Sequence, residues 1–399
     1  MACSSSDLPR IFLLPGQERR IASGHPWVYS NEVRMNDEAK ALEPGTPVIL
    51  CRADGKPLGV GAFNPRCLIC FRMMTDDAKV TVDRPFIAGR LKRALDLRRR
   101  LFPKPYYRLV HGEADGLPGL VVDRFGDAFS VQTSTAGMER MLDDVPAAID
   151  EVCAAKVVVI NNNGAFRKLE SLDSYVRVAK GTVEGPVEVH EGGVIFLADL
   201  LEGQKTGWFY DQRDNHAFVA GLCRDVRMLD IFCYGGGFAV SAAAAGAREV
   251  IAVDSSAGAI ALAEKAARLN GVDHRCSFVR ADAFTELERL AGAGERFGVV
   301  SADPPAFVKS RKDLKSGLKG YRKLARMAAE LVEPGGFLFI ASCSHNVDAE
   351  TFAKEIAIGI ARAERSGRII RSSGAAADHP VHPNLPESAY LKALTLQLD

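Results

Sequence analysis

Hydrophobic and polar residues follow one another in the second half of the chain in the order strand, turn, helix, strand. The stretch 226–254 begins with a short apolar run at Met228–Phe232, which three glycines at 235–237 interrupt. An alanine-rich segment, Phe238–Ala245, and a second apolar run, Val250–Val253, follow. Alanine favours helix, and short apolar runs bounded by glycine favour strand. The pattern predicts one βαβ unit.

The same alternation continues toward the C-terminus. It predicts an α/β fold of the Rossmann type, with a doubly wound, mostly parallel sheet. Helices are expected at 257–270, 284–290, 321–332 and 349–363, and strands at 276–279, 299–302 and 337–341.

The first half of the chain has a different pattern. Residues 10–75 alternate short apolar runs with turn residues, which is typical of a small β-rich module. The segment Arg84–Phe102 has helical periodicity, with Leu91, Leu95 and Leu97 near one face and basic residues, Arg98 among them, on the remainder. A basic helix of this kind is either a solvated face or an RNA contact. A β-meander is expected at 107–133, an amphipathic helix at 138–155, a strand at 157–161 and a hairpin around Gly192 and Gly193. These elements predict a β-rich domain at 1–77, a middle α+β domain at 78–180, a hairpin linker at 181–201 and an α/β domain at 202–399.

Composition narrows the class of protein. The 399 residues are 47% hydrophobic and 25% charged, with a net charge of +1, which is ordinary for a soluble globular protein. Any sign of a nucleic-acid partner must therefore come from local clusters of charge. The N-terminus has no apolar signal core, and no run approaches the roughly 18 apolar residues of a membrane helix, so a cytoplasmic protein without a membrane partner is expected. Nine scattered cysteines predict free thiols, and Cys67 and Cys70 are interpreted as strand residues, not as half of a zinc site.

The glycine turn indicates a nucleoside-containing ligand. Glycines let the backbone pass close beneath a ligand, and Asp254 follows the next strand, where a carboxylate can accept hydrogen bonds from ribose hydroxyls. A dinucleotide fingerprint needs a small residue at the position of Val240, so the match to pyrophosphate binding is poor. The alternative is a glycine turn that only packs within an α/β protein.

Polar residues follow the other predicted strands as well. Asp230, Asp282 and Asp303 each come at a strand end, and ligands bind at the carboxyl edge of such sheets. Asp282 is placed to accept the exocyclic amine of an adenine, with Ala283 and Phe284 beside the ring. Each acid could instead be a helix N-cap, although Asp254, Asp282 and Asp303 at three successive strand ends are harder to explain in that way.

The segments around D-P-P indicate what kind of substrate is bound. Pro304 and Pro305 fix the backbone after Asp303 and remove two N–H donors, which gives a stiff wall instead of a flexible loop. Residues 309–323 carry seven Lys/Arg against one Asp, a cluster suited to phosphate contacts.

Residues 203–219 mix polar side chains with aromatic ones, as in a loop that covers a ligand and leads into a helix near Asp211.

Cys343 predicts the type of reaction. Carbon 5 of a pyrimidine becomes nucleophilic when a thiolate adds to carbon 6, and a cysteine at the active edge supplies that thiolate. A free thiol has a pKa near 8.5, so the site must favour its ionised form. Asp303 is the nearest candidate for the base that removes the carbon-5 proton. Cys233 is interpreted as a small residue packed beneath the glycine turn.

These motifs resemble those of a known family. The turn D-I-F-C-Y-G-G-G-F resembles motif I of class I S-adenosylmethionine-dependent methyltransferases, and D-P-P-A-F resembles their motif IV. With G-H-P-W at Gly24–Trp27, D-G-L-P-G-L, G-Q-K-T-G-W-F-Y-D-Q-R and S-C-S, nearly the whole chain is similar to the large-subunit ribosomal RNA cytosine-C5 methyltransferase I family. The resemblance implies an N-terminal PUA domain that binds RNA, a middle domain, a Rossmann-like catalytic domain, S-adenosylmethionine as cofactor, 23S-type ribosomal RNA as substrate and a homodimer.

The resemblance and the strand ends together give a set of candidate site residues. Cys343 is the nucleophile and Asp303 the second catalytic residue, with no metal. Cofactor contacts are expected from Thr206, Phe209, Asp211, Arg213, Asp230, Tyr234, Gly235, Gly237, Asp254, Ser255, Asp282, Ala283 and Phe284. Substrate contacts are expected from Pro304, Pro305, Phe307, Lys309, Arg311 and Lys312.

One departure and three alternatives remain. Ala306 stands where other RNA cytosine-C5 methyltransferases carry a second cysteine, so the elimination step lacks that helper. An RNA uracil-C5 methyltransferase would use the same thiolate, but typically has an iron–sulfur cysteine cluster that is not visible here. A guanine methyltransferase branch shares D-P-P but is not expected to have the cysteine of S-C-S. A non-catalytic RNA-binding assembly factor would not need the acids, D-P-P or Cys343.

Overall fold

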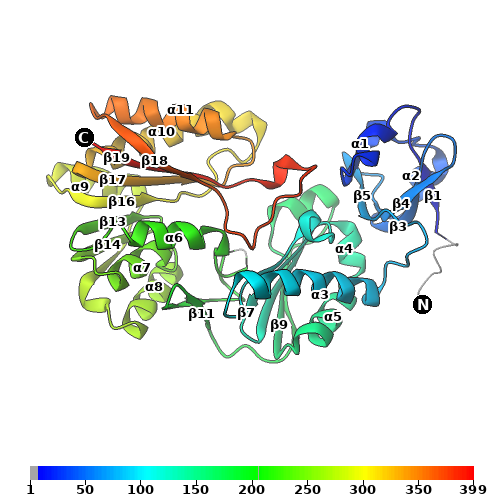
Figure 1. Cartoon of the computed structure of the whole chain (residues 1–399), viewed down its shortest axis with the longest axis horizontal. Coiled ribbons are helices and arrows are strands. Elements are labelled where there is room, and N and C mark those ends of the chain that lie inside the picture. Colours follow the sequence, from blue (N-terminus) through cyan, green and yellow to red (C-terminus); the bar gives the residue numbers. More distant parts are fainter. Residues whose placement is uncertain (1–7, 205) are drawn as a thin grey trace. The chain divides into compact units, whose positions relative to one another are not determined.

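The computed structural model describes residues 8–204 and 206–399, which form two compact units (Figure 1). The first unit runs to Val187 and also takes in Asp199–Gly207 and Asp378–Ser388. The second unit is made of Glu188–Ala198, Trp208–Ala377 and Ala389–Asp399. The chain thus passes between the units several times, and each unit is built from segments that are distant in sequence.

The N-terminal part of the first unit is a five-stranded sheet in the order β1-β3-β4-β5-β2. Its buried face carries large apolar side chains such as Val28, Phe63 and Phe71, which form one core cluster. This matches the β-rich module predicted for residues 10–75. The elements are β1 (Arg10–Phe12), α1 (Glu18–Ala22), β2 (Trp27–Tyr29), α2 (Asp37–Ala41), β3 (Thr46–Cys51), β4 (Pro57–Phe63) and β5 (Ile69–Thr75).

A second five-stranded sheet, in the order β10-β9-β8-β7-β6, follows in the same unit. The predicted helix 138–155 is in fact two helices, so that prediction was wrong. Pro146 lies in the first turn of the second helix, where its missing N–H costs nothing, whereas inside one continuous helix it would break a hydrogen bond. The elements are α3 (Arg84–Leu101), β6 (Tyr106–His111), β7 (Leu120–Phe125), β8 (Ala128–Thr133), α4 (Ala136–Arg140), α5 (Asp144–Cys153), β9 (Val157–Asn161) and β10 (Val176–Lys180).

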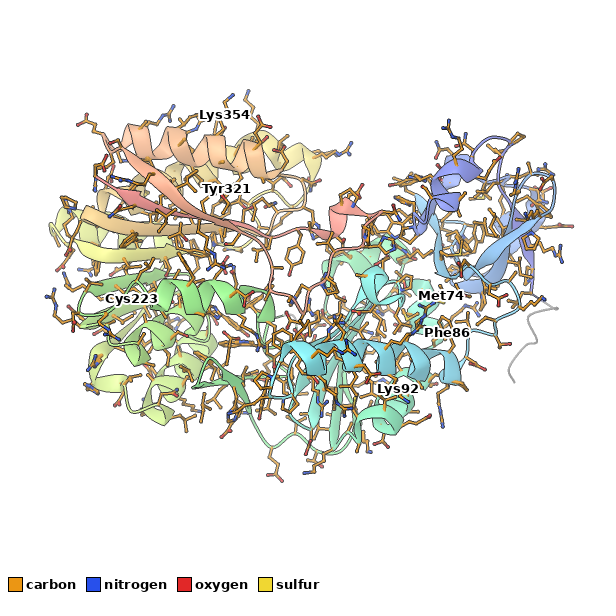
Figure 2. All side chains as sticks on the ribbon, in the orientation of Figure 1. Met74, Phe86, Lys92, Cys223, Tyr321 and Lys354 are labelled. Atoms are coloured by element: carbon orange, nitrogen blue, oxygen red, sulfur yellow. The ribbon has the colours of Figure 1, made fainter. Side chains whose placement is uncertain are left out.

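Two residues of α3 differ from the prediction, since Arg98 is buried instead of exposed and Leu97 is exposed instead of buried. Arg98 is fully buried, and its guanidinium makes two hydrogen bonds to the Asp115 carboxylate, at 2.6 and 2.8 Å, and one to the Asp378 carbonyl. Leu97 is 41% exposed. Lys92 lies on the solvent side of the helix (Figure 2). A buried arginine paired in this way belongs to the core, so the basic surface of α3 is smaller than the sequence predicted.

The second unit holds a hairpin and a seven-stranded sheet in the order β15-β14-β13-β16-β17-β19-β18. The first five of these strands are parallel, and β19 runs antiparallel between β17 and β18. The strands are β11 (Val187–Glu191), β12 (Val194–Ala198), β13 (Arg227–Ile231), β14 (Glu249–Asp254), β15 (Cys276–Arg280), β16 (Phe297–Ala302), β17 (Val332–Ser342), β18 (Gly367–Ser373) and β19 (Lys392–Leu398). The helices are α6 (Arg213–Ala220), α7 (Gly237–Ala244), α8 (Ala257–Leu269), α9 (Ala283–Gly292), α10 (Leu314–Glu330) and α11 (Ala349–Arg362).

The α/β fold class is confirmed, and the topology determines where a ligand binds. Figure 1 shows α10 and α11 on one face of the sheet and α6, α7 and α8 on the other. The order of the strands reverses at β13, whose neighbours are β14 on one side and β16 on the other. Ligands of such sheets bind beyond the carboxyl ends of the strands at this reversal. The two antiparallel strands β18 and β19 come after the last predicted element and were missed.

Candidate active site

The glycine turn after β13 has an unusual backbone. Phe232 and Tyr234 have φ angles of 66° and 46°, and Gly236 has a φ of 84°. Residues other than glycine rarely adopt this left-handed backbone conformation, which costs them about 1–3 kcal/mol each. Strain of this kind is concentrated at functional sites, so the conformation marks the turn as more than a connection.

At Gly235 and Gly237 there is little room for a larger residue, because neighbouring side chains occupy the space that its Cβ would need. A Cβ on Gly237 would lie 2.5 Å from the His216 ring, and one on Gly235 would lie 3.2 Å from the Trp208 ring. Glu191 joins these two neighbours, since its carboxylate contacts His216 Nδ1 at 2.7 Å and accepts a hydrogen bond from Trp208 Nε1 at 3.3 Å. The turn therefore rests on a buried layer that sequence reasoning did not find.

Asp230 is buried at the end of β13. One carboxylate oxygen accepts the backbone N–H of Ala239, and the other accepts the Ser301 hydroxyl at 2.6 Å. Burial raises the pKa of Asp230 to about 7, although these hydrogen bonds and nearby His216 favour the charged form. The carboxyl group thus ties the start of α7 to β16, the neighbouring strand.

Asp254 lies at the tip of β14, half-buried beside the turn. Its two oxygens accept the backbone N–H groups of Tyr234, at 3.0 Å, and Ser256, at 2.8 Å. Ser255 is exposed. Each carboxylate oxygen has a second lone pair, so this carboxylate is fixed in orientation and still has acceptor capacity for the hydroxyls of a ribose.

Asp282 is exposed and caps α9. Its carboxylate accepts the Thr285 N–H at 3.0 Å and the Thr285 hydroxyl at 3.1 Å, and the first of these bonds lowers the pKa of Asp282. Ala283 is buried, and the half-buried Phe284 ring has the Lys323 ammonium 4.9 Å from its centre. The N-cap interpretation is thus correct for Asp282, and it leaves room for a ligand contact through the carboxylate's other oxygen.

The polar segment before α6 contributes to both units. Thr206 is buried and belongs to the first unit, whereas Phe209, Asp211 and Arg213 belong to the second. The Phe209 ring meets the Tyr234 ring edge to face at 5.0 Å between centroids. Tyr390, just before β19, donates its hydroxyl proton to the Asp211 carboxylate. In the second unit this segment therefore contacts both the glycine turn and the residues just before the C-terminal strand β19.

Asp303 begins the D-P-P segment after β16. Gln212 donates its amide N–H to the Asp303 carboxylate at 2.8 Å, and Asn215 in turn donates to the Gln212 oxygen at 2.6 Å. Pro304 is buried and Pro305 is exposed. These two hydrogen bonds connect the Asp303 carboxylate to the start of α6.

The S-C-S segment at the end of β17 is bound to the D-P-P segment through one phenol. Tyr321 of α10 accepts the Ser342 hydroxyl proton at 2.7 Å, and its oxygen lies 2.8 Å from Ser344 Oγ. Ser344 also accepts the backbone N–H of Val308 at 3.2 Å. Cys343, between the two serines, is half-buried. Tyr321 lies between α10 and the sheet (Figure 2).

Of the remaining candidate substrate residues, Phe307 contacts this phenol and the three basic ones are exposed. The Phe307 ring packs on Tyr321 at 4.8 Å between centroids. Lys309, Arg311 and Lys312 are exposed, in the segment that leads into α10. That helix begins at Leu314, earlier than the predicted residue 321, so the rest of the basic cluster is helical. Lys323 lies over Phe284, and Lys315, Lys319 and Lys323 are exposed as well, so the positive surface continues from this segment into the helix.

Several buried groups near these residues were not predicted. Gln212 lies in the G-Q-K-T-G-W-F-Y-D-Q-R motif but was not predicted to be a site residue. Glu191 was predicted only to belong to a hairpin. His216, Tyr321 and Lys392 had no signal in the sequence, because their role depends on contacts between distant segments. Cys233 is buried and its thiol pKa is raised well above the ordinary value by burial, which agrees with the packing interpretation.

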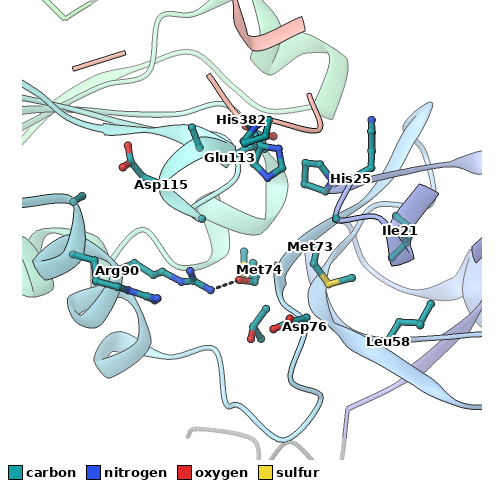
Figure 3. Close-up of a pocket in the computed structure, with 18 of the residues that line it drawn as sticks. Ile21, His25, Leu58, Met73, Met74, Asp76, Arg90, Glu113, Asp115 and His382 are labelled. Carbon is teal, nitrogen blue, oxygen red and sulfur yellow. Dashed lines mark hydrogen bonds between the residues drawn. The ribbon is translucent and has the colours of Figure 1, made fainter. Parts of the chain in front are cut away.

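Other features lie apart from these residues. A cavity of about 640 Å³ in the first unit is lined by Arg90, Arg93, His25 and the carboxylates of Asp76 and Glu113, among others (Figure 3). All eight cysteines among the described residues are free, whereas Cys3 lies outside them; Cys70 is in β5 but Cys67 lies in the turn before it. In residues 8–204 and 206–399, no helix has the length and apolar character needed to cross a membrane.

Comparison with protein families gives two matches. Residues 164–397 match a family of S-adenosylmethionine-dependent methyltransferases, and residues 11–76 match a PUA-like domain. Among curated proteins, ribosomal RNA large subunit methyltransferase I of Klebsiella pneumoniae is 35% identical over 405 residues, covering 99% of this chain and 100% of the relative. The protein of the same name from Aeromonas hydrophila is 36% identical, covering 97% and 98%.

Solved structures share the fold over nearly the whole chain. A structure described as a SAM-dependent methyltransferase from Streptococcus mutans has a TM-score of 0.82 at 20% identity, covering 98% of this chain and 100% of the other. A methyltransferase crystallised with SAH has a TM-score of 0.83, also at 20% identity and with the same coverage. At 20% sequence identity, this similarity shows a shared fold alone.

Proposed function

Because this chain belongs to the S-adenosylmethionine-dependent methyltransferases and to the family of ribosomal RNA large subunit methyltransferase I, we propose that it methylates carbon 5 of a cytidine in large-subunit ribosomal RNA. The proposal has three parts, namely the cofactor site, the thiolate chemistry and the binding of RNA. The first two are argued from residues of the second unit, with Thr206 of the first unit added to the cofactor contacts, and RNA binding also involves the PUA-like domain.

S-adenosylmethionine is the cofactor, and the residues around the glycine turn fit it. Asp254 holds acceptor lone pairs ready for the ribose, and Asp282 with Phe284 offers an acceptor and a ring for the adenine. Phe209 and Tyr234 are in contact beside the turn. The donor set suits a neutral nucleoside with a sulfonium, which supplies an electrophilic methyl group. We assign the remaining cofactor contacts to Thr206, Asp211, Arg213, Gly235, Gly237, Ser255 and Ala283.

Cys343 is the nucleophile in this proposal. Its Sγ loses a proton and adds to carbon 6 of the cytosine, which makes carbon 5 electron-rich. After carbon 5 has taken the methyl group, a base removes its proton, the electron pair reforms the double bond between carbons 5 and 6, and the thiolate leaves. Asp303 is our candidate for that base, because it opens the D-P-P segment at the carboxyl end of β16 and its carboxylate is oriented by a hydrogen bond from the Gln212 amide. Ala306 offers no second thiol for the elimination.

One observation carries the assignment of Cys343. The Tyr321 and Ser344 hydroxyls bind the S-C-S segment to the backbone of the segment that follows D-P-P. These segments end β17 and β16, which are neighbouring parallel strands. Cys343 and Asp303 therefore follow neighbouring strands at the same edge of the sheet, beside Pro304 and Pro305, where we expect the target base to lie.

RNA is bound by charge outside this edge. Lys309, Arg311 and Lys312 are exposed next to the D-P-P segment and are placed to contact phosphates. In the first unit, Arg90 and Arg93 line the cavity beside the PUA-like sheet, which offers a second region for the RNA backbone. We expect the protein to meet its RNA in the cytoplasm and to form a homodimer.

The test compares Cys343→Ser with the wild type. We expect the variant to bind S-adenosylmethionine by calorimetry with an unchanged Kd, and to lose methyl transfer to RNA by at least about a thousandfold, because a hydroxyl at neutral pH is a far weaker nucleophile. RNA that contains 5-fluorocytidine should form a covalent complex with the wild type, since fluorine at carbon 5 cannot leave as a proton.

Cys276→Ser is the matched control, because Cys276 is a half-buried thiol on β15, at the opposite edge of the parallel strands. It should retain both activity and trapping. Full transfer by Cys343→Ser would reject the thiolate mechanism, and 5-methyluridine or methylguanosine in the nucleoside digest would assign the enzyme to a different base. A wild type that binds RNA but transfers no methyl group would be a non-catalytic RNA-binding factor.

A further inference from the structure

Lys392, the first residue of β19, is a buried cation directly beside the S-C-S segment. Only 9% of the residue is exposed. In the antiparallel pairing of β19 with β17, Lys392 lies opposite Ser342, the residue before Cys343. The register of the sheet, not any sequence motif, therefore brings an ammonium group next to the proposed nucleophile.

The ammonium group holds the loop that contains Cys343. Lys392 Nζ donates one hydrogen bond to the Ser344 carbonyl and one to the Val347 carbonyl, each at 2.6 Å. Residues 343–348 connect β17 to α11, so these two bonds fix both ends of that connection. Among the residues that the structure describes, no carboxylate lies within ion-pair distance of Lys392 Nζ. A buried ammonium held only by neutral carbonyls is stabilised by any negative charge that develops nearby.

Cys343 is where such a charge would develop. Burial lowers the pKa of Lys392, and the negative charges of a Cys343 thiolate and of Asp348 act against that lowering. The interaction between two groups is mutual, so the same ammonium must favour the ionised form of Cys343. The site requires this effect, because an ordinary thiol is only a few per cent ionised at neutral pH.

We propose that Lys392 is a positioning residue that fixes the Cys343 loop and stabilises the Cys343 thiolate by its fixed positive charge. The inference rests on the proposed function of Cys343 as nucleophile. Lys392 keeps its three protons throughout; the thiol proton passes to water before attack, and the thiolate that returns at the end is again paired with the ammonium.

The other titratable groups around this loop cannot replace that charge. Tyr321 of α10 is a neutral phenol whose pKa is raised by burial. His345 is exposed and stacks on Tyr390, so water screens any charge it carries. Asp348 caps α11 and Asp303 ends the neighbouring strand, and both are acids that would oppose a thiolate.

The test measures the thiol directly. In the full-length protein, the rate at which iodoacetamide alkylates Cys343 is followed from pH 5.5 to 10 by mass spectrometry of the peptide that contains it. For Lys392→Met we expect the apparent pKa of Cys343 to rise by about one unit or more, and the rate at pH 7 to fall about tenfold. Lys354→Met, which removes an exposed lysine from the solvent side of α11 (Figure 2), should leave the profile unchanged.

A second variant separates charge from loop support. Lys392→Gln keeps N–H donors for the loop but carries no charge, and it should shift the profile as Lys392→Met does. Unshifted profiles in both variants would overturn the inference, as would a uniform change in rate with no shift in pKa, which indicates loop support alone. This readout needs no methyl transfer. If Cys343→Ser proved active, the proposed function would fail, whereas an unshifted profile beside an inactive Cys343→Ser would reject only the role of Lys392.

Discussion

The imidazole of His216 fills the space that any side chain at position 237 would require. A Cβ on Gly237 would lie 2.5 Å from two atoms of that ring, closer than real contacts allow. His216 is itself fixed by the buried Glu191 carboxylate. The third glycine of the turn is therefore constrained by the protein's own packing, independently of any ligand.

Gly237→Ala should destabilise the protein because the new methyl group overpacks this layer. We expect the free energy of unfolding, measured in urea, to fall by about 1–3 kcal/mol. Gly258→Ala is the matched control within α8, since only Ser256 Oγ, at 3.9 Å, lies near its added Cβ. That substitution should be neutral or stabilising by up to about 1 kcal/mol. Equal stability of the two variants would show that His216 moves aside at little cost.

The buried Asp230 should make stability depend on pH. Its folded-state pKa is about 7, whereas an unfolded aspartate has one near 3.9. The folded state therefore keeps a proton that the unfolded chain has already lost, and this contribution is full below about pH 4 and disappears as the pH rises to about 7.

Asp230→Asn removes this titration, because an amide stays neutral throughout. Urea denaturation at several pH values should show the wild type losing up to about 1.4 kcal/mol more per pH unit than the variant between pH 4 and 7. Parallel curves for the two proteins would place the pKa of Asp230 near its ordinary value.

Asp282 is a helix cap, and we propose that it is also a cofactor contact; Asp282→Ser separates the two. Serine caps helices as well as aspartate does, so the free energy of unfolding should change by less than about 0.5 kcal/mol. The Kd for S-adenosylmethionine, measured by calorimetry, should rise about tenfold if the carboxylate accepts the adenine amine. An unchanged Kd would leave Asp282 with capping as its role.

Replacing Lys309, Arg311 and Lys312 together by alanine should weaken RNA binding in a way that depends on salt. If each contacts one phosphate, the slope of log K against log salt should decrease by about 2 to 3. The control removes equal charge from exposed positions on α8 and α11, at Lys265, Arg268 and Lys354. Identical slopes for the two triple variants would mean that the basic segment acts only through overall charge.

The sequence predicted what depends on local pattern. The alternation of apolar runs and glycines located β13, α7 and β14, and the β-rich start of the chain was found in the same way. The helix at 138–155 failed because a single proline outweighed a continuous amphipathic pattern. Arg98 was wrongly predicted to lie on the surface, because helical periodicity cannot show that the Asp115 carboxylate is available in the core to pair with it.

What could not be predicted depends on pairing between distant segments. Lys392 lies beside Cys343 only because β19 inserts antiparallel between β17 and β18, and nothing near residue 392 specifies that register. Likewise Glu191 supports the glycine turn from a hairpin that precedes it by more than forty residues. Such contacts follow from the order of strands in the sheet, which a periodic pattern does not encode.

The left-handed backbone at Phe232 and Tyr234 has a consequence for protein engineering. Replacing either residue by glycine would relieve the backbone strain, and is therefore an obvious way to try to make the enzyme more stable to heat. Each change would also delete an aromatic ring, one that packs on the sheet core at Phe232 and one that meets Phe209 at Tyr234. A search for thermostable variants should therefore keep both positions fixed and sample the solvent-facing helices instead.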